Sequence, residues 1–137
     1  MKKYTHFAVI ALLMTLLFAC KKEETVVTTP VSNSLTAIYQ GSFTAASHPT
    51  TGTVTLSKDA AGKKYLVFTG FKTDAGPDLR VYLAEDLKAT NFVEITNKVV
   101  DGTYQLDVAA TIDTDKKRKV LIWCKQFSVL FGSADLK

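Results

Sequence analysis

Cys124 and His48 are the residues whose side chains could carry redox, nucleophilic or metal chemistry in the mature protein. The chain has two cysteines and two histidines, and the others, Cys20 and His6, lie at or before a predicted processing site. A blue-copper site needs two histidines and a cysteine, and an iron–sulfur cluster needs four ligands. The sequence therefore restricts the chemistry to one thiol and one imidazole.

Other cofactor and catalytic sites are also poorly supported. No Cys-x-x-Cys-His motif is present for covalent haem attachment, and a zinc site would need at least two carboxylates. His48 lies in a His-Pro turn with no nucleophile motif near it, which argues against a hydrolase. The acids of residues 74–78 and 85–86 would bind Ca²⁺ only if the fold joined them, and such residues are more often turn formers. We predict no metal site.

Two interpretations of Cys124 remain open. It is either a small core residue, as free cysteines often are, or a reactive thiolate favoured by the nearby cations Lys119 and Lys125. Lys125 is the weaker helper, because adjacent residues of a strand point to opposite faces. An unpaired thiol outside the cytoplasm is prone to oxidation, so it is either buried and inert or exposed and used. The two interpretations predict opposite reactivity.

The segment that contains Cys124 predicts buried strands. Residues 119–124 (KVLIWC) are apolar on both alternating faces, which favours a strand buried on both sides. With residues 127–131 it would form a single strand about 43 Å long at about 3.3 Å per residue, too long for a small domain. We therefore expect a bend at Lys125 and Gln126, and an end to the second strand at residues 132–133.

The N-terminus predicts a lipoprotein signal peptide over residues 1–19. Two lysines precede the apolar run of residues 7–18, which is long enough for a signal peptide and short for a membrane span. The sequence Leu-Phe-Ala-Cys at residues 17–20 is typical of a lipobox, which predicts that Cys20 is lipidated, for example with palmitate. Ordinary cleavage with Cys20 left free is the alternative. An anchored Cys20 leaves Cys124 without an internal disulfide partner.

Residues 20–35 are predicted to be the lipidated cysteine and a flexible linker. The charged run KKEE at residues 21–24 is either a surface-export signal or a solvated linker, and the Thr- and Ser-rich remainder is typical of a tether. We expect anchoring in the cell envelope, at either face of the outer membrane. The net charge of +4 falls to +2 without Lys2 and Lys3, and the sequence has no nucleic-acid footprint.

Residues 36–137 predict one all-β domain. Short alternating segments are separated by turns every 8–12 residues, and no stretch of ten or more has helical periodicity. The pattern favours a single antiparallel β-sandwich or jelly-roll-like barrel of about eight or nine strands, with one helical turn at residues 85–91. The expected strands are residues 38–45, 53–57, 65–71, 79–83, 92–96, 104–108, 119–124 and 127–131.

Three segments resemble the DM-thirteen domain, a small β module also found beside DOMON domains. They are WCKQFSVLFGSADL at residues 123–136, GPDLRVYL at residues 76–83 and TGTVTL at residues 51–56. The resemblance covers residues 38–136, and its most specific part is the C-terminal segment. The family's W-C-x-x-F hallmark falls on Trp123, Cys124 and Phe127. The resemblance implies an electron-transfer role, which is inferred from that cysteine.

Two hypotheses for the function follow. In the first, the domain is a lipid-anchored redox module in which Cys124, flanked by Trp123 and Phe127, reacts with an unidentified partner or ligates a cofactor. Haem held axially by Cys124, alone or with His48, in an apolar pocket with residues such as Trp123, Phe127 and Phe131, is chemically permissible, although the sequence does not require it. In the second, the domain is a non-enzymatic binding or adhesion module, and Cys124 is a structural core residue.

Overall fold

The computed structural model describes residues 34–137. The predicted signal peptide of residues 1–19, the predicted lipidation site Cys20 and nearly all of the linker of residues 20–35 lie outside this range. Among residues 34–137, no helix has the length and apolarity needed to cross a membrane.

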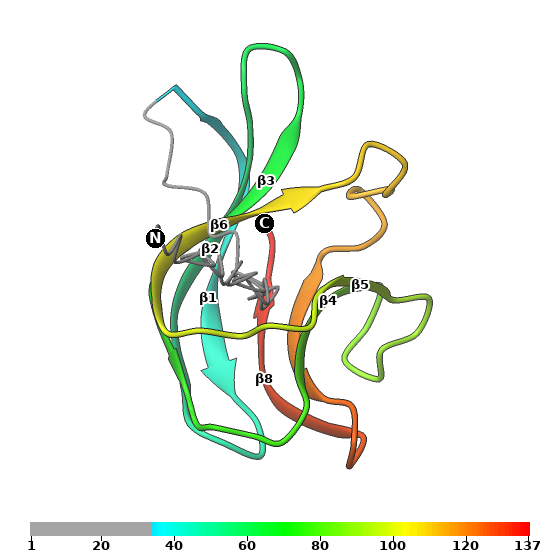
Figure 1. Cartoon of the computed structure of the whole chain (residues 1–137). Coiled ribbons are helices and arrows are strands. Elements are labelled where there is room, and N and C mark those ends of the chain that lie inside the picture. Colours follow the sequence, from blue (N-terminus) through cyan, green and yellow to red (C-terminus); the bar gives the residue numbers. More distant parts are fainter. Residues whose placement is uncertain (1–33) are drawn as a thin grey trace, which may run out of the picture.

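The described residues form one antiparallel sheet of eight strands in the order β5-β4-β7-β8-β1-β2-β3-β6. The end strands β5 and β6 contact each other, so the sheet curls into a nearly closed barrel (Figure 1). In Figure 1, β8 in red lies beside β1 in cyan, which brings the two ends of the domain together. The strands are β1 (Thr36–Ala45), β2 (Thr50–Lys58), β3 (Lys64–Thr73), β4 (Leu79–Ala84), β5 (Val93–Thr96), β6 (Gly102–Val108), β7 (Lys119–Cys124) and β8 (Val129–Asp135).

The all-β prediction is confirmed, and so is the break after Cys124, where residues 125–128 form a turn. The expected strand end at residues 132–133 is wrong, because β8 continues to Asp135. Gly132 does not form a turn. It lets Thr50 approach the strand closely, because a Cβ at this position would lie 2.4 Å from the Cβ of Thr50. Glycine inside a strand often marks such a contact between neighbouring segments.

The expected helical turn at residues 85–91 is also wrong. Asp86 accepts the backbone N–H groups of Lys88 and Thr90 at 2.9 Å each. The backbone is left-handed at Ala89 and Asn91, with φ of 57° and 48°. An aspartate that bonds the backbone two residues ahead competes with the helical pattern, so the segment forms a compact loop.

Alternate residues of the strands fill the barrel interior, as the period-two pattern predicts. Val54 and Leu56 of β2 and Val120 and Ile122 of β7 are fully buried there. Aromatic rings complete the core, and the rings of Phe68 and Tyr104 stack with centroids 4.7 Å apart. Each fully buried Leu, Val or Phe side chain contributes about 1.5–3 kcal/mol.

The strands β4 and β7 are apolar on their outer faces as well. Tyr82 and Leu121 are buried there, and Trp123 packs against them. Phe92 stacks on Tyr82 with ring centroids 4.2 Å apart. The loop of residues 85–92 therefore rests on the outside of the barrel, and β7 is covered on both sides.

The hydroxyl of Tyr104 is the exception in this core. It is buried and has no hydrogen-bond partner among the described residues. Burial raises the pKa of Tyr104 well above its usual value, and the nearby charge of Asp101 adds to the effect. A buried polar group without a partner costs about 1–3 kcal/mol.

We therefore predict that Tyr104→Phe increases the free energy of unfolding by up to about 1–3 kcal/mol, because it removes the unpaired hydroxyl and keeps the ring. Urea denaturation followed by fluorescence measures this. Tyr65→Phe is the matched control: its hydroxyl donates to Asp59 at 3.0 Å, so its loss should cost about 0.5–1.5 kcal/mol. A destabilised Tyr104→Phe variant would show that the hydroxyl has a partner.

Candidate functional site

Cys124 is the last residue of β7 and points into the barrel. Its exposed fraction is 0%, and it belongs to the same core cluster as Val120 and Ile122. Among the described residues, no hydrogen bond or ion pair involves the thiol. The native state therefore holds Cys124 in apolar surroundings, closed to solvent.

The segments of residues 76–83 and 123–136 meet at this cysteine. The antiparallel ladder between β4 and β7 places Leu79 opposite Cys124 and Arg80 opposite Trp123. One residue further, the N–H of Lys125 donates to the carbonyl of Asp78 at 2.9 Å. The loop before β4 is thus fastened to the chain immediately after Cys124.

The loop of residues 74–78, hereafter the cover loop, closes this end of the barrel. Gly76 packs so tightly that a Cβ would lie 2.8 Å from Cδ2 of Leu79 and 3.0 Å from Cζ of Phe131. Phe131 belongs to the same core cluster as Cys124. No side chain larger than hydrogen fits at Gly76 without a shift of its neighbours, so the loop is closely fitted to the core beneath it.

Arg80 connects the cover loop to the sheet. Its Nε donates to Asp78 at 2.6 Å, and its Nη1 donates to Glu94 of β5 at 2.7 Å. These two hydrogen-bonded carboxylates raise the pKa of Arg80 above its usual value. The planar guanidinium can bridge two carboxylates in a fixed geometry, which an ammonium group cannot. Arg80 is therefore a positioning residue for the cover loop.

His48 holds the other side of the cover loop. Its Nδ1 lies 3.2 Å from Oδ2 of Asp74, and its ring stacks on Phe131 with centroids 3.8 Å apart. The imidazole is partly exposed and has a structural contact on each side. The sequence indicated only a turn residue at His48, because the residues that contact it, Asp74 and Phe131, are 26 and 83 positions away in the chain.

The other hallmark side chains do not join Cys124. Trp123 lies on the outer face of β7, where its ring centroid is 6.4 Å from that of Tyr82. Phe127 is in the turn after β7 and is 62% exposed. Of the three aromatic residues named for a haem pocket, only Phe131 shares the core cluster of Cys124. The residues present do not fit a haem bound at Cys124, because the thiol lies in a filled core.

The predicted helper cation Lys119 and the acids of the two loops have other partners. Lys119 lies at the opposite end of β7 and pairs with Asp135 at 2.8 Å. The acids of the two loops have separate partners: Asp74 contacts His48, and Glu85 accepts from Asn91 at 3.2 Å. Within residues 34–137 no group of three or more His, Cys, Asp or Glu side chains is arranged to hold a metal ion.

A family model described as electron transfer DM13 matches residues 42–136, which include the cover loop, β4 and the whole of β7 and β8. The chain belongs to the DM13 family. No curated protein and no solved structure matches it. The match to the DM13 model spans most of the barrel, from within β1 to the residue after β8.

We predict that Arg80→Gln speeds the reaction of Cys124 with a thiol reagent in the native protein. The amide cannot bridge Asp78 and Glu94, so the cover loop opens more often. The measurement is the native labelling rate in a plate-reader assay, alongside the free energy of unfolding from urea denaturation. A rate change that merely follows the change in global stability would contradict the positioning role.

The ion pair between Lys63 and Asp107 provides the control. It is equally short, at 2.6 Å, and both side chains are about half exposed. Because it joins β6 to the loop before β3, away from the cover loop, Lys63→Gln should leave the labelling rate of Cys124 unchanged. Exposed pairs of this kind contribute about 0–1 kcal/mol.

Proposed function

We propose that this DM13 domain transfers electrons through thiol chemistry at Cys124, as a lipid-anchored protein of the cell envelope. One observation carries the proposal: Leu79 of one family segment lies opposite Cys124 of the other, and the carbonyl of Asp78 accepts the N–H of Lys125. Both segments lie within residues 42–136, which the family model matches.

The chemistry that fits a single thiol is exchange with a disulfide of a partner protein. The Cys124 thiol loses its proton to solvent, and its sulfur attacks one sulfur of the partner disulfide. A new S–S bond forms, the partner's S–S bond breaks, and the electron pair leaves with the partner's second sulfur. Cys124 is thereby oxidised and the partner reduced. Attack by a second thiol on the mixed disulfide returns Cys124 to the reduced form.

Burial makes this reaction dependent on an opening step. Sγ of Cys124 is closed to solvent, so a partner sulfur reaches it only after part of the fold opens, and in this proposal the cover loop is that part. Loops commonly open with a lower free energy than the whole fold. The cover loop is attached through hydrogen bonds to Arg80, Lys125 and His48, and its separation from the barrel would leave the strands paired.

A binding module with a structural cysteine is the second candidate. The observation that favours it is the complete burial of Cys124 among apolar side chains, with no charged partner. Free cysteine in such surroundings packs as a small hydrophobic residue. In that case Cys124 is reached only when the whole domain unfolds.

The labelling of Cys124 distinguishes the two candidates. In residues 26–137, which keep the entire core, Cys124 is the only cysteine. Electron transfer through the cover loop predicts native labelling at least about tenfold faster than global unfolding allows, which is about 1.4 kcal/mol in opening free energy. It also predicts that the labelling rate depends only weakly on urea, because opening of the cover loop exposes little surface. The assay uses a chromogenic disulfide reagent across a urea series.

The structural alternative predicts that labelling rises with urea as steeply as global unfolding does. That result would remove the redox role of Cys124. The control variant Cys124→Ala should give no signal at all, and Ser47→Cys supplies an exposed thiol that reports the intrinsic rate of the reagent. In cells, Cys124→Ser should lose any mixed disulfide that the native protein forms.

The lipid anchor predicts a separate result. Full-length chain expressed in a Gram-negative bacterium should incorporate a fatty-acid probe, and Cys20→Ser should not, because the acylated thiol is absent. Click labelling followed by gel fluorescence measures incorporation, with Cys124→Ser as the matched cysteine control. Incorporation that persists in Cys20→Ser, or its absence from the native chain, would contradict lipidation at Cys20.

A further inference from the structure

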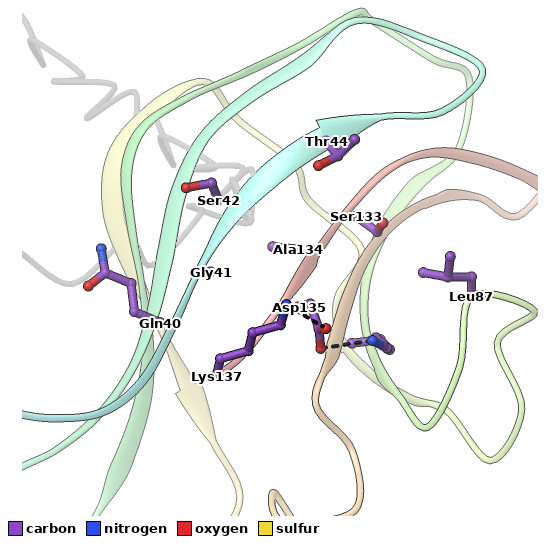
Figure 2. Close-up of a pocket in the computed structure, with 10 residues that line it drawn as sticks. Gln40, Gly41, Ser42, Thr44, Leu87, Ser133, Ala134, Asp135 and Lys137 are labelled. Carbon is purple, nitrogen blue, oxygen red and sulfur yellow. Dashed lines mark ion pairs between the residues drawn. The ribbon is translucent and has the colours of Figure 1, made fainter.

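A polar hollow of about 660 Å³ lies on the outer face of β1, β7 and β8, away from the cover loop. Figure 2 shows side chains from β1 and β8 around it, with Leu87 on the loop of residues 85–92 at its rim. Small-molecule sites commonly have volumes of about 300–1,000 Å³. The hollow is therefore large enough for a sugar-sized ligand.

Strand alternation places the polar groups of the hollow on one surface. Ser42 and Thr44 of β1 lie two residues apart and face the same side, and so do Ser133 and Asp135 of β8. The ladder between the strands places Thr44 directly opposite Ser133. The result is a grid of neighbouring hydrogen-bonding side chains on the barrel wall.

The hydroxyl groups of this grid are available to a ligand. Ser42, Thr44 and Ser133 form no side-chain hydrogen bond within residues 34–137. Each hydroxyl is one donor and two acceptors. Gly41 also lines the hollow and packs closely against β8, where a Cβ would lie 2.5 Å from the carbonyl oxygen of Asp135.

The hollow holds one carboxylate and two ammonium groups, which are paired with each other. Asp135 lies 2.8 Å from Nζ of Lys119 and 3.6 Å from Nζ of Lys137, and Figure 2 shows the side chains of Asp135 and Lys137 side by side. The hydrogen bond from Lys119 and the charge of Lys137 hold the pKa of Asp135 below its usual value, so the carboxylate stays ionised at neutral pH. An anion would have to approach this carboxylate, and both ammonium groups are already engaged with it. The site is suited to an uncharged ligand.

The rim of the hollow is prearranged. Asp86 fixes the loop that carries Leu87 by accepting the N–H groups of Lys88 and Thr90. Phe92, at the end of this loop, stacks on Tyr82 of the barrel wall. Leu87, half exposed, offers an apolar surface beside the polar grid. A prearranged site loses less conformational entropy when a ligand binds.

We propose that the hollow binds a neutral, hydroxyl-rich ligand, a monosaccharide or disaccharide unit of a glycan. The Asp135 carboxylate accepts from adjacent sugar hydroxyls, and the Ser and Thr hydroxyls donate to and accept from others. Leu87 covers the C–H face of the ring. This binding site is separate from Cys124 and does not depend on the redox proposal.

The test is an NMR titration of residues 26–137 with glucose, galactose, N-acetylglucosamine and chitobiose, each to about 20 mM, well above the roughly 1 mM dissociation constant of a weak site. At least one sugar should shift the amide signals of Ser42, Thr44, Ser133 and Asp135 in a saturable manner. Thr44→Val and Asp135→Asn should each weaken that binding several-fold or abolish it.

Thr69→Val is the matched control, because Thr69 is an exposed strand threonine of β3 outside the hollow. It should bind the sugar as the native protein does. Inorganic phosphate is titrated in parallel. The proposal is overturned if no sugar shifts these signals, if phosphate shifts them and no sugar does, or if Thr44→Val and Asp135→Asn bind as well as Thr69→Val.

Discussion

The pairing of β4 with β7 is the constraint on which the rest of the domain depends. Both strands are buried on both faces, with Val81 and Ile122 inside the barrel and Tyr82 and Leu121 outside it. Residues apolar on both sides are stable only in the interior of a covered sheet. The inner face places Cys124 in the core, next to Lys125, whose N–H donates to the cover loop. The outer face supports the loop of residues 85–92, which forms the rim of the polar hollow.

The burial of Cys124 changes what an electron-transfer role requires of the fold. An exposed reactive cysteine would react at a rate determined by its own chemistry. In the proposed mechanism the rate also contains the free energy of moving the cover loop, which Asp78 and Gly76 fasten from different directions. Under that proposal, one loop both protects the unpaired thiol and controls access to it. This reconciles a closed ground state with the DM13 family's electron-transfer description.

The two candidate sites lie at opposite ends of the same strand. Lys119 begins β7 and faces outward into the polar hollow, whereas Cys124 ends it and faces inward. A single strand is enough to separate the two sites, because its alternate residues point to opposite faces and six residues span about 17–20 Å. Ligand binding at one site and thiol chemistry at the other can therefore be altered independently.

Local patterns in the sequence predicted much of the fold. The alternation of residues such as Val54, Leu56 and Ile122 placed them in the core, and the length of the run around Cys124 required the turn that follows β7. Two local signals failed. Gly132 predicts a strand end but makes room for Thr50, and the acid-rich segment at Asp86 predicts a helical turn but forms a loop.

The sequence by itself determined the all-β class, the two-sided burial of β7 and the scarcity of groups capable of redox chemistry. These follow from side-chain type and a period of two, which are local properties. Only the tertiary structure decided that Gly76 closes over Phe131 and that Arg80 bridges Asp78 and Glu94. Which strands pair depends on contacts between residues far apart in the chain, and a one-residue change of register would reverse every face.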